Sequence, residues 1–277
     1  MLTVDILVCT LDDGIQKVDS VLLSPIPYIR YVISWQQSKE EQEDIPKSLI
    51  RSDVKIVTIK GKGLSRNRNN ALKHAISDIC LIADDDVTYD ISGIERLCQY
   101  YENNPDIDLI AFQFSSNSSK KKYPNIDFDL RKSPKGYSVS SIEISFRREK
   151  VQGIQFFNEL LGLGSPMCDS GEENVFILDC LNSGLNCHYY PFSVVFHEGE
   201  STGRSRGGET RVVFSRGVLT RIFNPKTYMI KYILLARSIK INHDVSLLKT
   251  LLTLIKGGQY AKRNGLIKYD ISKIYIK

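Results

Sequence analysis

The chain has 277 residues, of which 42% are hydrophobic, 25% are charged and 9% are aromatic, and its formal net charge at pH 7 is +5. This composition is typical of a globular protein, and it excludes collagen, a disordered chain and a small scaffold held together by disulfides. A chain of this length buries about 70 to 75% of the surface that it exposes when unfolded, so its core requires neither disulfides nor a structural metal.

The first residues and the cysteines predict a cytoplasmic protein. The run MLTVDILVCT has no basic lead-in and is interrupted by Asp5, so it does not resemble a signal peptide. The sequence has no run of about 18 apolar residues, so no membrane-spanning helix is expected. None of the six cysteines forms a CxxC pair, and Cys9 and Cys80 lie in apolar runs. We therefore expect buried, reduced thiols rather than disulfides or zinc ligands.

Short apolar runs alternate with helical patterns in the first half of the chain. The runs that predict strands are Val4 to Cys9, Tyr28 to Ser34, Val54 to Ile59 and Ile79 to Ala83, and the segments that predict helices are Ser65 to Ile76 and Ile91 to Glu102. Runs with so few polar positions are expected for strands buried on both faces of a parallel sheet. The alternation predicts an α/β, doubly wound domain, in which ligands bind beyond the carboxyl ends of the strands.

The second half of the chain begins with a polar stretch from Ser115 to Lys135, which predicts a loop that covers the sheet. The later predicted elements are a strand at Tyr137 to Phe146, a helix at Glu172 to Asn182, short strands at Asn186 to Tyr190 and Val194 to Phe196, and a mobile loop at Ser201 to Gly208.

The tail of the chain is strongly basic. Residues 226–277 contain eleven Lys or Arg and two acidic residues, a net charge of +9, which leaves −4 for residues 1–225. Aliphatic residues recur there at helical spacing, which predicts two basic amphipathic helices with a break near His243 and Asp244. Two alternatives stay open: the helices lie on an anionic membrane surface, or they pack on the rest of the chain or on a second copy as a homodimer. No nucleic-acid-binding module is recognisable.

Three acidic residues, Asp84, Asp85 and Asp86, directly follow the apolar run Ile79 to Ala83. Adjacent carboxylates repel one another, so their place at the end of a buried strand is costly unless a cation neutralises them. Mn²⁺ or Mg²⁺ is the expected cation, because such ions take oxygen ligands and keep positions open for substrate phosphates. The alternative is an acidic turn in which Asp86 caps the next helix.

A second segment, GKGLSRNRNNAL at residues 61–72, precedes this triplet. Gly61 and Gly63 allow a tight turn out of the third strand, and Ser65 is predicted to cap the following helix. Arg66 and Arg68 bring donors to the same sheet edge as the triplet, and a helix N-terminus flanked by arginines suits a phosphate. The spacing is not that of a Walker loop, and an ordinary connection with solvated arginines is the alternative.

Together, the two segments resemble the family 2 glycosyltransferases with the GT-A fold, in which the Asp-rich triplet is the DxD motif. The segment GEENVFILDCLNSGLNCHYYP, residues 171–191, resembles that family's acidic helix-start motif, and His197 falls where many relatives have a histidine. The resemblance covers most of residues 1–220. It implies a GT-A catalytic domain at residues 1–225, with a mostly parallel sheet flanked by helices. The charge and helical spacing of the tail predict a basic helical extension at residues 226–277.

The resemblance implies a nucleotide-diphosphate sugar as donor, most often one with uridine. The triplet would touch the ribose and hold the Mn²⁺ or Mg²⁺ ion that bridges the diphosphate. We accordingly expect Asp84 and Asp85 to bind the donor, and Asp86, Asp84 and His197 to bind the metal.

The remaining donor contacts are expected at the ends of the first three strands. Thr10 and Asp12 would lie near the nucleobase, and Gly63 and Arg66 near the phosphates. The segment Ser34-Trp35-Gln36-Gln37 departs from the family, because relatives often carry an acidic residue there. Gln36 is expected to form amide hydrogen bonds with a uracil edge instead.

The catalytic base is expected in the acidic motif. Inverting transfer by a single displacement needs a carboxylate that takes the proton from the acceptor hydroxyl. Glu173 aligns with the usual second acid of the motif, and its neighbour Glu172 is the other candidate. Acids at a helix N-terminus also interact favourably with the helix dipole, which is the structural alternative for this pair. The loop Ser201 to Arg211, with three arginines, is expected either to close over the diphosphate or to form a solvated connection.

The sequence therefore predicts a metal-dependent, inverting glycosyltransferase that builds a cell-surface polysaccharide or glycolipid. Its acceptor would be a glycan or a lipid-linked glycan, and its place the cytoplasm or the inner face of the membrane. One alternative is a sugar-nucleotide nucleotidyltransferase, which would need a basic, Gly-rich loop where the chain has the acidic Leu11 to Gly14. The other alternative is a non-catalytic module that binds a nucleotide or a glycan.

Overall fold

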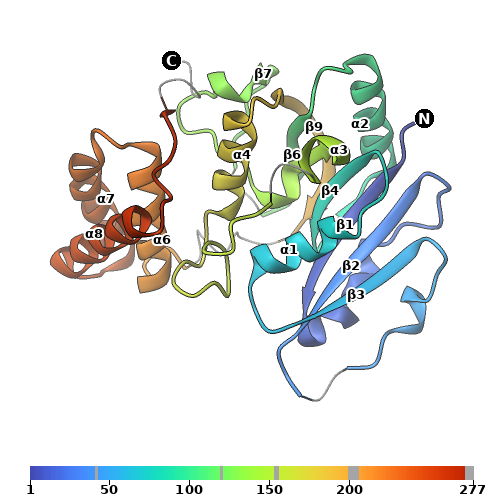
Figure 1. Cartoon of the computed structure of the whole chain (residues 1–277), viewed down its shortest axis with the longest axis horizontal. Helices are drawn as coiled ribbons and strands as arrows, with labels where there is room; N and C mark the ends of the chain where they lie inside the picture. Colours follow the sequence, from blue (N-terminus) through green and yellow to red (C-terminus); the bar gives the residue numbers. More distant parts are fainter. Residues whose placement is uncertain (41–42, 119–120, 153–155, 199–205, 272–277) are drawn as a thin grey trace. The chain divides into compact units, whose positions relative to one another are not determined.

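The computed structural model describes the chain except for residues 41–42, 119–120, 153–155, 199–205 and 272–277 (Figure 1). The chain forms two compact units. The first contains Met1–Asn158 and Glu173–Gly199, and the second contains Glu159–Glu172 and Glu200–Ile276. The predicted boundary at residue 225 separates the catalytic domain from the basic tail and is not a division into compact units. It stays a prediction.

The first unit is built on one sheet. Its strands are β1 Val4–Leu11, β2 Ile29–Gln37, β3 Val54–Lys60, β4 Ile79–Asp84, β5 Val87–Tyr89, β6 Leu109–Ser115, β7 Phe128–Asp129, β8 Ile144–Arg147 and β9 Cys187–His197. Their order is β3-β2-β1-β4-β8-β6-β9-β5, and β7 pairs with β9. Strands β1, β2, β3, β4, β6 and β9 run in one direction and β5, β7 and β8 oppose them. The four predicted strands of the first half are confirmed as β1 to β4, all parallel.

The helices are α1 Leu64–Lys73, α2 Ile91–Asn103, α3 Arg148–Gln152, α4 Glu172–Asn182, α6 Thr210–Phe223, α7 Tyr228–His243 and α8 Leu247–Arg263. Short 3-10 turns occur at Asp12–Gln16, Val18–Val21, Lys47–Leu49, Leu130–Lys132 and Ser141–Glu143. The predicted helices at α1, α2, α4, α7 and α8 are confirmed within a few residues. Helix α6 has no counterpart among the predictions, which assigned its first two residues to a loop that ends at Arg211.

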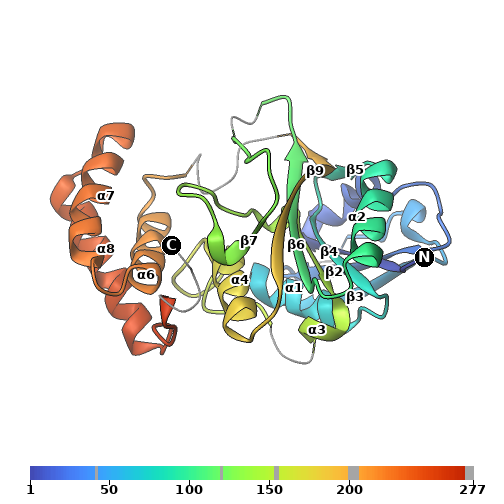
Figure 2. The same ribbon diagram turned by 90° about the horizontal axis from the view of Figure 1, so that it is seen from above.

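The sheet is covered on both faces, as its apolar strands require. Helix α2 and the first 3-10 turns pack on one face, where Ile94 and Leu97 join a buried cluster with Val8 and Leu81. Helix α1 lies on the other face, where the Asn70 amide donates to Ser34 Oγ at 2.8 Å. Figure 2 shows α2 on one side of the sheet and α1 and α4 on the other. All six cysteines are buried free thiols, as predicted, and burial raises the pKa of Cys9 to about 12.

Two strand predictions in the second half are wrong in extent. The segment Tyr137 to Phe146 is a strand only from Ile144, because a 3-10 turn precedes it. The two short strands predicted around Pro191 are one strand, β9. The register of β6 with β9 shifts between Ala111 and Gln113, and this irregularity accommodates the proline, which has no N–H for a regular ladder.

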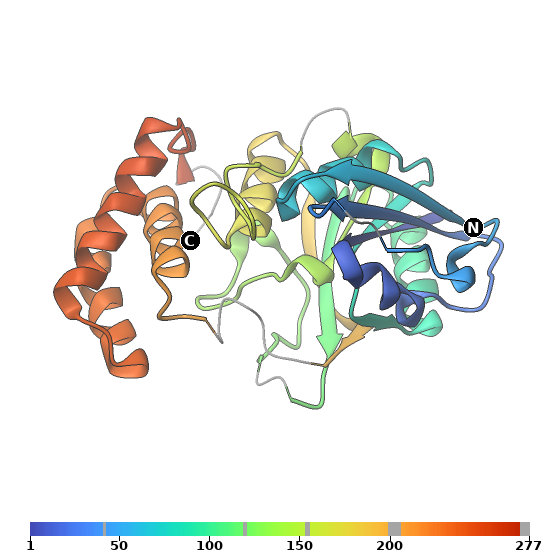
Figure 3. The ribbon, with the colours of Figure 1, turned by 90° about the horizontal axis from the view of Figure 1, so that it is seen from below.

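In the second unit, α6, α7 and α8 pack against one another (Figure 3). Their core contains Val213, Tyr232, Ala236, Ile239 and Leu254. Glycines let α6 and α8 approach closely, because a Cβ atom on Gly217 or Gly257 would collide with the backbone of the other helix. The inner stripes of the tail helices are therefore packed within this unit. Among the described residues, no helix has the length and apolarity that crossing a membrane requires.

Candidate functional site

The acidic triplet lies at the carboxyl end of β4, beside the end of β1. The parallel register sets Asp84 opposite Cys9, so Asp85 follows at the level of Thr10. The Thr10 hydroxyl donates a hydrogen bond to Asp85 Oδ2 at 2.5 Å. Burial, together with the charges of the neighbouring aspartates, raises the pKa of Asp85 although the Thr10 hydrogen bond opposes the shift. The triplet thus concentrates negative charge where the central strands end.

A buried arginine faces this charge. Arg68 of α1 is 1% exposed, and its Nη2 atom lies 3.2 Å from Asp84 Oδ1. The guanidinium also lies over the ring of Phe157, with its carbon 5.5 Å from the ring centre. Arg68 therefore links the triplet to the aromatic packing on this face of the sheet.

His197 lies beside the last residue of the triplet. Strand β5 pairs with β9 in the antiparallel sense, and the register sets Val87, which directly follows Asp86, opposite His197. His197 Nε2 lies 3.4 Å from Asp86 Oδ2, and the ring of Phe114 packs edge-on against the imidazole at 6.0 Å. Because β5 follows the triplet, Asp86 does not cap a helix; the cap of α2 is Asp90, whose carboxylate accepts from Ser92 N at 3.2 Å.

These residues suit a divalent cation only together with a substrate. Asp86 and His197 offer a carboxylate oxygen and an imidazole nitrogen side by side, both at least partly exposed. Among the described residues, no group of three or more His, Cys, Asp or Glu side chains is arranged to hold a metal ion. A Mn²⁺ or Mg²⁺ ion commonly takes one or two protein ligands and completes its shell with phosphates and water. The pair fits such an ion, while Asp84 is directed to Arg68.

The turn from β3 into α1 uses both predicted glycines. Gly61 and Gly63 have φ values of +95° and +132°, in the region that favours glycine. The helix begins at Leu64, so Ser65 lies inside it and is not its cap. Arg66 is exposed, and its Nη1 atom donates to the Lys60 carbonyl at 2.8 Å.

The same helix start joins the ends of β1 and β2. The Asn67 amide donates to the Thr10 carbonyl at 3.0 Å, and the Gln36 amide donates to the Gly63 carbonyl at 3.1 Å. Asn67 is 2% exposed, and its Oδ1 atom has no hydrogen-bond partner within the described part of the chain. This acceptor marks Asn67 as a further candidate for ligand binding, which the motif alone did not single out.

Asp12 is turned toward the end of β2. Its φ is +49°, a left-handed conformation that Asp tolerates better than most residues, and its carbonyl accepts from the Trp35 indole at 2.8 Å. Its carboxylate oxygens accept from Ser38 N and Oγ, both at 2.6 Å. Burial works to raise the pKa of Asp12, but the Ser38 hydrogen bonds and the charge of Lys39 outweigh it and hold the pKa below its ordinary value. Asp12 thus connects the turn after β1 to the end of β2.

The acidic motif forms the start of α4. Glu172 is its first residue and is 5% exposed, whereas Glu173 is half-buried and accepts from the Asn174 amide at 2.6 Å. Phe176 stacks on Phe157 with ring centres 4.2 Å apart, and Phe157 carries the Arg68 guanidinium on its ring. Residues three apart share a helix face, so Glu173 lies on the face of α4 that Phe176 turns toward this stack.

Comparison with known proteins identifies the family. The sequence profile described as Glycosyl transferase family 2 matches residues 16–158, which is just over half of the chain. The chain belongs to glycosyl transferase family 2. It is therefore a glycosyltransferase, and the nucleotidyltransferase and non-catalytic alternatives are wrong. No curated protein sequence matches the chain.

The fold of this glycosyltransferase is similar to that of solved family members. The crystal structure of S. aureus TarS 1–349 superposes with a TM-score of 0.53 at 12% identity, covering 98% of this chain and 77% of that one. The same TarS segment in complex with UDP-GlcNAc has a TM-score of 0.54 at 14% identity, covering 98% and 78%. Its complex with UDP has a TM-score of 0.55 at 12% identity, covering 97% and 93%. The predicted GT-A fold, a mostly parallel sheet flanked by helices, is thereby confirmed.

Gly14 is a further residue of the glycosyltransferase site that the sequence did not single out. A Cβ atom at this position would collide with Thr10 Oγ1 and would lie 2.5 Å from Asp85 Oδ2. The backbone after β1 therefore passes directly over the Thr10–Asp85 hydrogen bond, and only glycine leaves room for it.

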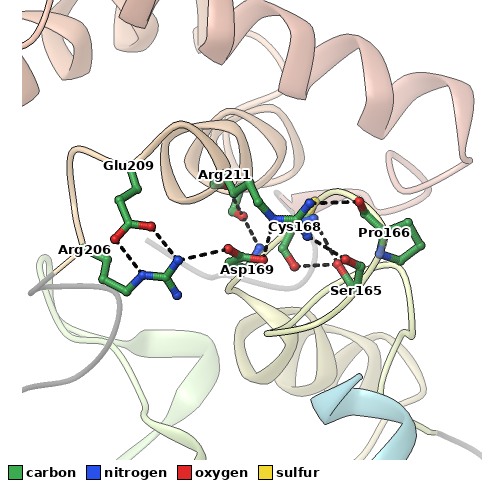
Figure 4. A network of polar contacts seen from close by, with 8 residues as sticks. Ser165, Pro166, Cys168, Asp169, Arg206, Glu209 and Arg211 are labelled. Carbon is green, nitrogen blue, oxygen red and sulfur yellow. Dashed lines mark hydrogen bonds and ion pairs between the residues drawn. The ribbon is translucent and has the colours of Figure 1, made fainter. Parts of the chain in front are cut away.

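The arginine-rich segment before α6 has a specific partner in the described structure. Arg211 Nε donates to Asp169 Oδ1 at 2.8 Å, and Arg206 Nη2 lies 3.6 Å from the other oxygen of Asp169. Figure 4 shows both guanidinium groups turned toward this buried carboxylate. Arg204 lies outside the described residues. In the glycosyltransferase, Arg206 and Arg211 thus bind the segment that leads into α4, and closure of this loop over a diphosphate stays a prediction.

Proposed function

We propose that the protein transfers a sugar, with inversion, from a nucleotide-diphosphate donor to a hydroxyl group of a glycan or lipid-linked glycan. The observation that carries this proposal is the acidic triplet at the end of β4, faced by Arg68 on one side and His197 on the other. The donor is proposed to be a UDP-sugar. The structures of TarS in complex with UDP-GlcNAc and with UDP support this choice.

Each part of the site has a proposed role in holding the donor. Thr10, Asp12 and Gln36 lie at the ends of the first strands and would bind the nucleoside, whereas Gly63 would lie near the phosphates. Arg66 is exposed at the same edge and is free to turn toward the phosphates.

The triplet would hold the ribose and the diphosphate. Asp84 and Asp85 are proposed to bind the donor, and Asp86 with His197, and with Asp84 as a further ligand, to hold Mn²⁺ or Mg²⁺. A bound divalent ion would neutralise the charge that develops on the departing diphosphate. Arg68 would hold the Asp84 carboxylate in place, since its Nη2 atom lies 3.2 Å from Asp84 Oδ1.

The proton of the acceptor hydroxyl must move to a base for the new glycosidic bond to form. We assign this role to Glu173, with Glu172 as the alternative, because the start of α4 carries both carboxylates. In an inverting reaction the acceptor oxygen bonds to the anomeric carbon as the diphosphate leaves from the opposite side.

We also propose that the enzyme acts in the synthesis of a cell-surface polysaccharide or glycolipid. It would work in the cytoplasm or at the inner face of the membrane, where a lipid-linked acceptor is accessible. The alternative to membrane contact is that the basic helices of the tail join two copies of the chain as a homodimer.

Titration with UDP by calorimetry, with and without Mn²⁺, tests the donor site. We expect binding that Mn²⁺ strengthens, and we expect the variant Asp86→Ala to lose this dependence on Mn²⁺. Binding of UDP that is equally strong with and without the metal would contradict the metal site. If the wild-type chain binds GDP or CDP but not UDP, the choice of nucleotide is wrong while the site stands.

The variant Gly14→Ala tests whether the turn after β1 shapes this site. Its Cβ atom would displace Thr10 and Asp85, two residues proposed to bind the donor, so we expect UDP affinity to fall about tenfold, the effect of one lost hydrogen bond between the protein and a charged ligand. The neighbouring exposed substitution Asp13→Ala is the matched control and should leave the affinity unchanged. Equal affinities for the two variants in the same calorimetric titration would show that the turn does not contact the site.

A further inference from the structure

Helix α7 is apolar on two opposite faces. Its inner stripe, Tyr232, Ala236 and Ile239, is buried in the core of the second unit. On the opposite face, Ile230 is 64% exposed, Leu234 58% and Ile241 81%. Spacings of four and seven residues place these three side chains in one line along the helix, and Ile233 widens the line. A stripe of large aliphatic side chains in water is unfavourable, so it indicates a partner.

The exposed stripe carries positive charge and no negative charge. Arg237 lies between Leu234 and Ile241 on the same face, and Lys231 and Lys240 flank it, all three exposed. The sequence of α7 contains no Asp or Glu, and the single acidic residue of the connection to α8 is Asp244. This face therefore has aliphatic side chains along its centre, with Arg237 among them and Lys231 and Lys240 at its two sides.

The charge pattern decides between the partners that such a face fits. In a symmetric contact between two copies, the same face would meet itself, and Arg237, Lys231 and Lys240 would face their own counterparts without an acid on α7 to pair with them. Interface cores between proteins are also depleted of charge. An anionic membrane surface accepts this pattern, because the aliphatic side chains enter the boundary of the acyl chains while the cations meet the headgroups.

We propose that the outer face of α7, Ile230, Ile233, Leu234, Arg237 and Ile241, binds the surface of an anionic phospholipid bilayer, with the helix lying in the plane of the interface. The outer face of α8 has the same chemistry, since Leu248, Lys249, Leu252, Lys256 and Arg263 are exposed. This proposal does not depend on the sugar donor, because it concerns the second unit alone.

Cosedimentation of the full chain with vesicles tests the proposal. We expect binding to vesicles of phosphatidylcholine mixed with phosphatidylglycerol, little binding to phosphatidylcholine alone, and release by added salt. The triple variant Ile230→Gln, Leu234→Gln, Ile241→Gln should reduce the bound fraction at least about tenfold. The matched control is Ile50→Gln, Ile76→Gln, Ile126→Gln, which removes three isoleucines of similar exposure from the first unit and should bind like the wild type.

Thermal unfolding and size-exclusion chromatography of all three proteins complete the test. A triple variant that stays folded and still binds anionic vesicles like the wild type would overturn the proposal. A wild-type chain that binds neither kind of vesicle would also overturn it. If that chain elutes as a dimer and the triple variant elutes as a monomer, the face is an interface between copies. The charge reversal Arg237→Glu gives a second measurement that does not remove apolar area, and it should weaken binding to the anionic vesicles.

Discussion

Replacing Glu173 by Gln is expected to reduce sugar transfer by about 10²- to 10⁴-fold while UDP binding stays unchanged, because a general base contributes to the chemical step and not to donor binding. The amide keeps the size of the side chain and its contact with Asn174, but it cannot take a proton. The measurement is the release of UDP from a UDP-sugar, with water or a glycan as acceptor. Calorimetry with UDP provides the binding constant separately.

Two companion variants make this result interpretable. Glu172→Gln changes the buried neighbour, and Glu149→Gln changes an exposed glutamate of α3. If Glu172→Gln loses turnover and Glu173→Gln keeps it, the roles of the two residues are exchanged. If both keep turnover while Glu149→Gln behaves like the wild type, the start of α4 does not provide the base and the assignment fails.

The variant Arg68→Ala is expected to destabilise the protein by about 2 kcal/mol, because it removes a buried side chain and breaks its ion pair with the partly exposed Asp84. Arg68 is among the largest fully buried side chains, so its removal also leaves a space beside Phe157. The three carboxylates of the triplet would then lose the cation that faces Asp84. Urea denaturation measures the change in the free energy of unfolding, and UDP titration measures the accompanying loss of binding.

The neighbouring arginine provides the contrast. Arg66→Ala removes an exposed side chain that contacts the Lys60 carbonyl, so it should change the free energy of unfolding by no more than about 0.5 kcal/mol. Arg68→Lys keeps the charge but loses the planar group on Phe157, and an intermediate stability is expected. Equal urea midpoints for Arg68→Ala and the wild type would show that the pair with Asp84 does not stabilise the fold.

Much of the first half of the fold follows from local patterns in the sequence. Apolar runs with few polar interruptions predict buried parallel strands, and β1 to β4 have that arrangement. The elements of the second half were harder to predict, because β8, β9 and α6 depend on partners far away in the chain. Strand β9 continues through Pro191 since its pairing with β6 is irregular at that point, which no pattern within β9 reveals.

Some residues of the candidate site could also be predicted from the sequence, whereas others could not. The sequence identified the acidic triplet and the glycines of the turn from their place at the ends of predicted strands, and it identified His197 from the resemblance to the family. It named Arg66 as a donor contact and gave Arg68, which faces the triplet, no separate role. Two residues apart on a helix means roughly opposite faces, so one of them points into the protein and the other to solvent, and only packing shows which is which.

The sequence by itself thus determined the class of fold and the family, and it named most residues of the candidate site, since these inferences depend on residue types and on neighbours along the chain. The tertiary structure decided which groups meet. The pairing of β5 with β9 sets His197 beside Asp86, the packing of α1 directs Arg68 to Asp84, and the packing of α6 to α8 leaves one apolar face of α7 exposed. Contacts of this kind arise from strand register and helix packing between distant segments, and a local pattern carries no information about them.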